Sequence, residues 1–135
     1  MNWFDQCFDK LIAHEGGYVL DPKDAGGETN FGISKRAYPN LDIAQLTLEE
    51  AQALYKRDYW DKLNLDVLSW EMGLILFDAA VNQGQGFEHT LIGNSIEVMS
   101  ARAVRYAENP NFTRYGKGWM HRLFNIFKLA QVTPK

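Results

Sequence analysis

The stretch His14-Glu15-Gly16-Gly17-Tyr18 joins an apolar helical pattern to a loop rich in glycine and aspartate. Before it, apolar residues recur at three- and four-residue spacing, which predicts an amphipathic helix over residues 3–15. The two glycines end that helix, because glycine takes the left-handed conformation of a helix C-cap without a steric penalty. The spacing therefore puts Glu15 on the apolar face of the last helical turn.

Glu15 is a candidate general acid because of where this pattern places its carboxyl. Partial burial raises the free-energy cost of a negative charge, and the C-terminal end of a helix is itself negative. Both effects favour the protonated carboxylic acid. A carboxyl that keeps its proton near neutral pH is the group that general acid catalysis needs.

The loop after Glu15 supplies a second carboxylate, Asp24, and a hydroxyl, Thr29. A half-buried glutamate facing a solvated aspartate is typical of glycoside hydrolysis, in which one group protonates the leaving oxygen and the other activates water or stabilises positive charge. We expect the Thr29 hydroxyl to help hold that water. The acidic loop is also compatible with a solvated turn or a poor cation site, since it lacks the ligand spacing of an EF-hand.

The composition predicts one globular domain over residues 1–135, because 135 residues with 46% apolar content can bury one core. Cys7 is the single cysteine and lies on the apolar face of the first predicted helix, so we expect a buried thiol. The histidines and the cysteine form no metal-ligand pattern, and no nucleic-acid-binding motif is recognisable. We therefore expect no metal, no cofactor and no nucleic-acid partner.

The first residues contain neither a basic segment nor an apolar run long enough for a signal peptide or a membrane span. We expect a protein that is cytoplasmic when synthesised and does not insert into membranes. Its charge is uneven: residues 1–100 carry 7 Lys/Arg and 16 Asp/Glu, whereas residues 101–135 carry 7 Lys/Arg and 1 Glu. The basic end is expected either to attract an anionic polymer or to be a solvated helical face.

Local patterns predict a mainly α-helical fold with one small β-hairpin, which pairs residues 18–20 with residues 29–33. Asn2 and Asp5 have capping-box spacing at the first helix. A second capping box, Thr47-Leu-Glu-Glu50, opens a helix that reaches about residue 63.

The most apolar helix is expected at residues 72–81, with Ser69 as its cap, and it is expected to be buried on every side at the centre of the domain. A helix over about residues 88–107 follows. The last helix is expected to begin near Phe112 or Lys117 and to turn four aromatic and aliphatic side chains toward the core: Trp119, Leu123, Phe124 and Phe127.

Short distinctive motifs lie along the first two thirds of the chain. They are Glu15-Gly-Gly-Tyr18, Asp21-Pro22, Asp24, Gly26-Gly27-Glu-Thr29-Asn30, Gly32-Ile33, Tyr59-Trp60-Asp61 and Phe77-Asp78-Ala-Ala-Val-Asn82-Gln-Gly84, followed near the end by Gly118-Trp119-Met-His-Arg122. In type and order they resemble the bacterial and phage N-acetylmuramidases of glycoside hydrolase family 108, within the lysozyme superfamily. The resemblance implies a lysozyme-like fold, with about five helices around the central helix and the hairpin beside a cleft.

The resemblance also implies an activity and roles for particular residues. It implies hydrolysis of the β-1,4 bond between N-acetylmuramic acid and N-acetylglucosamine, with Glu15 as the catalytic acid and Asp24 and Thr29 as its helpers. Counting back from Gly32 instead places Asn30 where phage-type lysozymes have their threonine. The remaining expectations concern substrate contacts and one ion pair: Tyr18 and Asn30 flank the cleft, Asn82 presents an amide to the substrate, and Asp78 pairs with Arg122.

Residues 85–111 depart from the family pattern. Relatives carry a longer peptidoglycan-binding segment with an Asp-Gly turn in this place, and this chain has neither. We therefore divide the domain into a part that carries the catalytic motifs, residues 1–84, and a helical C-terminal part, residues 85–135, as a remnant of a wall-binding segment.

Together these observations predict a monomeric muramidase, a phage endolysin or a related bacterial wall hydrolase, whose partner is peptidoglycan and which reaches the wall through a holin or another export route. Three alternatives stay open. A lytic transglycosylase would cleave the same bond and leave anhydro-sugars. A non-catalytic module would bind wall sugars without turnover, and an interaction protein would use the basic residues 101–135 to bind nucleic acid.

Overall fold

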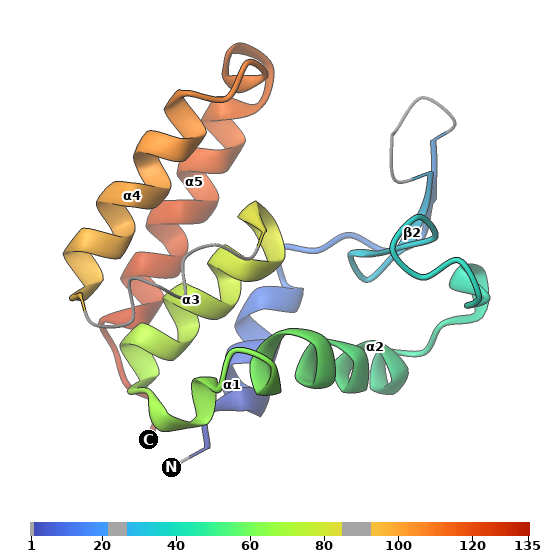
Figure 1. The fold of residues 1–135 in the computed structure, drawn as a ribbon, viewed down its shortest axis with the longest axis horizontal. Coiled ribbons are helices and arrows are strands. Elements are labelled where there is room, and N and C mark those ends of the chain that lie inside the picture. The colour runs from blue at the N-terminus through green and yellow to red at the C-terminus, as the bar shows by residue number, and fades with distance from the viewer. Residues whose placement is uncertain (1, 22–26, 85–92) are drawn as a thin grey trace.

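Five α-helices and a short antiparallel sheet make up the parts of the chain that the computed structural model describes, residues 2–21, 27–84 and 93–135. The helices are α1 (Phe4–Ile12), α2 (Leu48–Tyr55), α3 (Trp70–Gln83), α4 (Ser95–Ala107) and α5 (Phe112–Ala130), and the strands are β1 (Val19–Leu20), β2 (Glu28–Asn30) and β3 (Ile33–Ser34). Figure 1 shows the strands at one end and the α4–α5 pair at the other, with α1 and α3 between them. The predicted mainly helical fold is confirmed.

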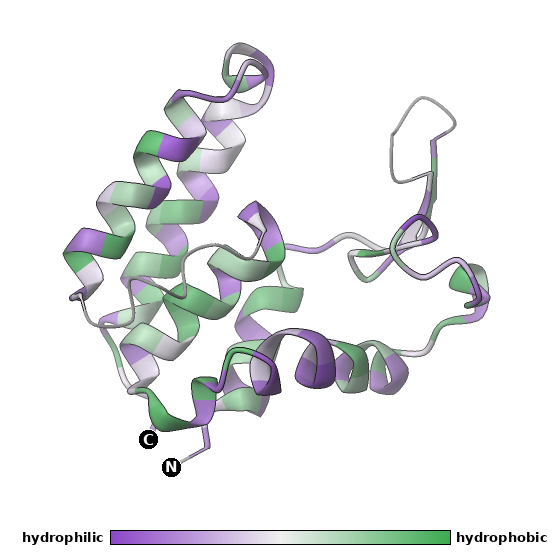
Figure 2. Ribbon diagram, viewed as in Figure 1, coloured by the Kyte–Doolittle hydropathy of each residue, from purple (hydrophilic) through white to green (hydrophobic). Residues whose placement is uncertain are grey.

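Helix α3 is the central element, as predicted. Every residue from Gly73 to Ala80 is buried, and α3 packs against α1, α4 and α5. Its N-terminus is closed by the Ser69 hydroxyl, which accepts a hydrogen bond from the Met72 amide. Figure 2 shows α3 as hydrophobic along most of its length, with hydrophilic residues at its C-terminal end. A helix that is apolar all round belongs inside a domain.

Aromatic side chains from α1, from the π-helical segment η2 (Lys56–Asp61) and from α3 pack together in the core. Phe4 packs edge-on against Trp60 with ring centroids 5.5 Å apart, and Trp60 packs edge-on against Phe77 at 5.3 Å. Trp60 is therefore a core residue, and its indole nitrogen donates a hydrogen bond to Asp66. Cys7 is buried as predicted, and burial raises the pKa of its thiol to about 12, which leaves it unreactive.

The first helix is shorter than predicted, because it ends at Ile12 and not at Glu15. The amides of His14 and Glu15 bond to the carbonyls of Leu11 and Ile12, three residues back, so the chain tightens and leaves the helical path before Gly16. The predicted capping box is also wrong: Asn2 accepts a hydrogen bond from the Phe4 amide, two residues on, and not from Asp5.

The sheet has three strands where a single hairpin was expected. β1 pairs with β2, and β2 turns directly into β3 with Asn30 opposite Ile33. The two residues of that turn, Phe31 and Gly32, both have positive φ, +53° and +76°. Two successive positive φ angles characterise the tight hairpin turn that matches strand twist. Phenylalanine is an unusual residue at such a position, so the turn has a weak sequence signal.

Two further helices agree with expectation, and one core assignment does not. The capping box at Thr47 is present, and α2 continues through the π-helical segment η2 (Lys56–Asp61).

α5 begins at Phe112, but Phe124 is 60% exposed. The buried side of α5 follows Gly116, Leu123, Ile126 and Ala130, and Phe124 lies one residue, or about 100°, away from that stripe. α4 begins at Ser95; the expected start near residue 88 lies outside the described residues.

Candidate active site

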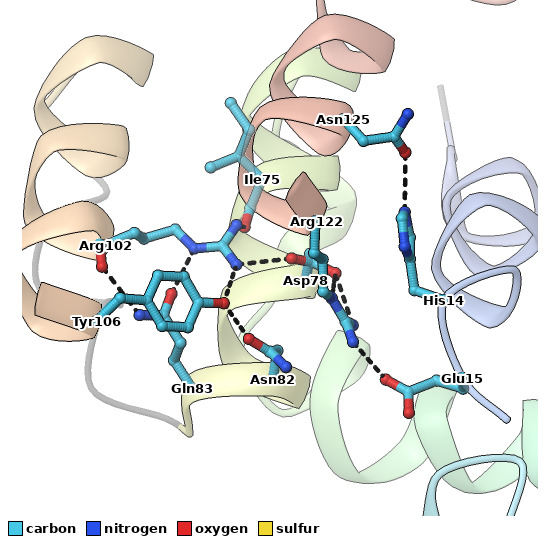
Figure 3. A network of polar contacts seen from close by, with 10 residues as sticks. All are labelled: His14, Glu15, Ile75, Asp78, Asn82, Gln83, Arg102, Tyr106, Arg122 and Asn125. Atoms are coloured by element: carbon cyan, nitrogen blue, oxygen red, sulfur yellow. Dashed lines mark hydrogen bonds and ion pairs between the residues drawn. The ribbon is translucent and has the colours of Figure 1, made fainter. Parts of the chain in front are cut away.

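Glu15 lies in the tight turn after α1, between helix α5 and the β2–β3 turn. Its Oε1 forms an ion pair with Nη1 of Arg122, 3.0 Å away, and its side chain is 18% exposed. Figure 3 shows the Glu15 carboxylate pointing at the guanidinium. Glu15 is therefore partly buried, as predicted, but it faces a cation from α5 in place of the apolar surface and helix end that were expected.

The other oxygen of Glu15 faces the β2–β3 turn. A Cβ placed on Gly32 would lie 2.7 Å from Oε2 of Glu15 and 2.5 Å from the hydroxyl of Tyr55, so neither group leaves room for a side chain there. The Tyr55 hydroxyl donates a 2.7 Å hydrogen bond to the Phe31 carbonyl and so ties the turn to α2. Burial, and to a smaller extent the Glu15 charge, raise the pKa of Tyr55, which keeps this donor protonated.

Arg122 links Glu15 to Asp78 in the central helix. Its Nε and Nη2 donate to Oδ1 of Asp78 over 3.0 and 2.8 Å, so the predicted Asp78–Arg122 pair is confirmed. Burial acts to lower the pKa of Arg122, but the charges and hydrogen bonds of Asp78 and Glu15 outweigh it, and the pKa is raised. The guanidinium is therefore always charged.

The sheet holds Thr29 and Asn30 in different environments. Thr29 is half-buried on β2, opposite Val19 on one side and Ser34 on the other. Asn30 is 7% exposed, and its amide nitrogen donates to the Ile43 carbonyl over 3.0 Å. The Asn30 side chain therefore ties β2 to the segment around Ile43. Asp24 lies outside the described residues.

Two of the expected substrate contacts, Tyr18 and Asn82, have hydrogen-bond partners of their own. Tyr18 is 46% exposed, and its hydroxyl donates a hydrogen bond to Glu28. Asn82 accepts a hydrogen bond from Tyr106, at the polar end of α3. Asn82 lines a recess of about 150 Å³ together with Gln83, Arg105, Tyr106, Asn109 and Trp119. Trp119 is half-buried and stacked on Tyr106, so it is less enclosed than a core residue.

Sequence reasoning missed two residues that contact Glu15 or its turn. Arg122 was expected beside Asp78 alone, although its place in the Gly118-Trp119-Met-His-Arg122 motif marked it as more than a surface cation. Tyr55 lies within the helix predicted from Thr47 to about residue 63, and no local pattern reveals that its hydroxyl reaches the β2–β3 turn. His14, next to the acid, bonds to Asn125 of α5 over 2.8 Å.

Residues 2–21, 27–84 and 93–135 contain no group of three or more His, Cys, Asp or Glu side chains arranged to hold a metal ion. In those same ranges, every helix is too short or too polar to cross a bilayer.

A mainly helical domain with a short sheet beside a half-buried glutamate fits a lysozyme-like fold. The chain belongs to the glycosyl hydrolase 108 family, whose sequence profile matches residues 8–84, and it is therefore classed with the glycoside hydrolases. A solved structure of SagA from Brucella abortus shares the fold: it is 24% identical, with a TM-score of 0.82 over 95% of this chain and 93% of that chain. The comparison with curated proteins gave no match.

Gly32→Ala is expected to lower activity by about 10²-fold, because the new methyl group would displace the Glu15 carboxylate or the Tyr55 hydroxyl from the turn. A non-glycine residue at a φ of +76° also costs about 1–2 kcal/mol. The matched control is Gly27→Ala, which has a φ of +69° and nothing within 4 Å of the new Cβ. The rate of glycan hydrolysis and the free energy of unfolding should be measured for both variants. If Gly27→Ala loses as much activity as Gly32→Ala, backbone strain alone accounts for the loss.

Proposed function

We propose that this protein hydrolyses the β-1,4 bond between N-acetylmuramic acid and N-acetylglucosamine in bacterial peptidoglycan. The observation that carries the proposal is the setting of Glu15: one carboxyl oxygen is bound by Arg122, and the other lies against the β2–β3 turn, in a chain of a glycoside hydrolase family. Family membership supports a substrate in peptidoglycan.

In the proposed reaction, Glu15 donates its proton to the leaving glycosidic oxygen. A second carboxylate then has to stabilise positive charge at the anomeric carbon or activate water, and we propose Asp24 for this role. The Thr29 hydroxyl orients the water. Tyr18 and Asn82, both with some exposed surface, are the proposed contacts with the sugar chain.

We also propose a biological setting, in which the protein acts as a phage endolysin or a related bacterial wall hydrolase and reaches the wall through a holin or another export route. In this setting the protein acts on the peptidoglycan of the wall, and it does so as a monomer. Lysis of cells made permeable at the inner membrane tests this setting separately from the chemistry.

The experiment that tests the chemistry is mass spectrometry of the fragments released from purified peptidoglycan. Hydrolysis adds one water per bond cleaved, and the proposal expects fragments with reducing N-acetylmuramic acid ends. Anhydro-muramic ends, which lack that water, would replace the hydrolase with a lytic transglycosylase. Retention of the protein on peptidoglycan without released fragments would replace it with a binding module.

A further inference from the structure

Four charged side chains of alternating sign run from the candidate acid to the far side of the central helix. Glu15 bonds to Arg122 over 3.0 Å, Arg122 to Asp78 over 2.8 Å, and Asp78 to Arg102 over 2.6 Å. Figure 3 shows this chain crossing from the turn after α1 to α5, α3 and α4. Exposure falls from 18% at Glu15 and 11% at Arg122 to 0% at Asp78 and Arg102.

The guanidinium of Arg122 divides its donors between two carboxylates. Nε and Nη2 both bond to Oδ1 of Asp78, and Nη1 alone reaches Oε1 of Glu15. The fully buried Asp78 therefore fixes the plane of the Arg122 guanidinium. The orientation of that plane in turn fixes where Nη1 holds the Glu15 carboxylate. A lysine has one compact ammonium group and cannot reproduce this two-sided geometry.

Asp78 is itself held on the opposite side by Arg102. Its Oδ2 accepts from Nη2 of Arg102, and the other donors of that guanidinium bond to Oε1 of Gln83 over 2.6 Å and to the Ile75 carbonyl over 3.2 Å. A buried ionic group stays in place when its hydrogen-bonding capacity is used in this way. Arg102 and Arg122 both lie outside residues 8–84, the part matched by the family profile.

We propose that Arg122 is a positioning residue of the reaction, which holds Oε1 of Glu15 so that Oε2 is the oxygen that delivers the proton. Asp78 bonds directly to Arg122, and Arg102 holds Asp78 from the other side. Residues of α4 and α5 therefore help to position the catalytic acid. This inference rests on the proposed function, because it takes Glu15 as the acid.

In the part of the chain that the structure describes, Arg122 supplies the positive charge that faces Glu15. Among the described residues, the titratable groups near the acid include the hydroxyls of Tyr55 on α2 and Tyr59 on η2, whose pKa values are raised by burial and also by the Glu15 charge, and the neighbouring His14, which is bonded to Asn125. Removing the positive charge of Arg122 disfavours the Glu15 anion relative to the acid. Activity that needs the acid should then persist to higher pH.

The test compares Arg122→Met and Arg122→Lys with Lys117→Met, a control that removes an exposed positive charge from the same helix. kcat and KM are measured from low to high pH on soluble peptidoglycan fragments, and folding is checked by circular dichroism. For Arg122→Met we expect kcat to fall about 10²-fold and the high-pH limb of the profile to move to higher pH. Arg122→Lys keeps the charge, so its high-pH limb should stay near that of the parent while kcat remains low.

Other outcomes separate this inference from the proposed function. If both Arg122 variants are folded and keep the parental kcat and pH profile, Arg122 serves stability alone and the inference is wrong. A loss of thermal stability without a change in the pH profile would lead to the same conclusion. An active Glu15→Gln variant would instead overturn the proposed function itself, whatever the Arg122 variants do.

Discussion

Glu15→Gln is expected to lower kcat on peptidoglycan by about 10²- to 10⁴-fold, the range that a general acid contributes. The amide has nearly the same shape as the acid, and its oxygen can still accept the hydrogen bond from Nη1 of Arg122. It has no acidic proton for the leaving glycosidic oxygen. The fold should therefore persist while turnover stops, and fragment release measured by mass spectrometry checks both the rate and the product.

The control for this substitution is Glu49→Gln, which makes the same change of charge at an exposed position in the first turn of α2. We expect parental activity from it. KM should change little in Glu15→Gln, because the variant loses a group that acts in the transition state. A Glu15→Gln enzyme that digests peptidoglycan at the parental rate would remove Glu15 from the role of acid.

Asp78→Asn is expected to destabilise the protein by about 3–5 kcal/mol, the usual cost of leaving a buried charge without its partner. Asp78 and Arg102 are both 0% exposed, so water cannot replace the lost carboxylate. A loss of this size lowers Tm by roughly 10–20 °C in a chain of this length. Urea and thermal unfolding, followed by circular dichroism, measure the change.

The matched control is Asp61→Asn, which breaks the exposed pair between Asp61 and Lys56, whose side chains are 47% and 43% exposed. We expect a change within about 0.5 kcal/mol there, because exposed pairs contribute little. A double-mutant cycle adds Arg102→Met, and the double variant should lose less than the two single variants together. Additive losses would mean that Asp78 and Arg102 contribute independently.

Much of the helical architecture could be predicted from local patterns. The hydroxyls of Thr47 and Ser69 cap helices in the structure as their spacing predicts. The unbroken apolar run of α3 predicts its central place, because a helix without a polar face is stable only when it is surrounded. The family motifs indicated Glu15, and the apolar surroundings of Asp78 indicated that it would pair with a cation such as Arg122.

The errors concern features whose outcome depends on distant contacts. The first helix stops at Ile12, before the glycines that were expected to end it, because the amides of His14 and Glu15 bond to carbonyls three residues back. Phe124 has the hydropathy of a core residue, but α5 turns Leu123 and Ile126 inward. Arg102 was counted with the basic C-terminal charges, yet it is fully buried and neutralised by Asp78.

Local sequence by itself determined where α2 and α3 begin, that α3 lies at the centre, and that a glutamate stands at the entrance to a glycine-rich turn. These features depend on caps and on apolar spacing over a few residues. Only the tertiary structure decided what surrounds that glutamate. Arg122 and Gly32 reach it from distant parts of the chain, and charges so far apart in sequence meet only because α5 and the β2–β3 turn pack on opposite sides of the same carboxyl.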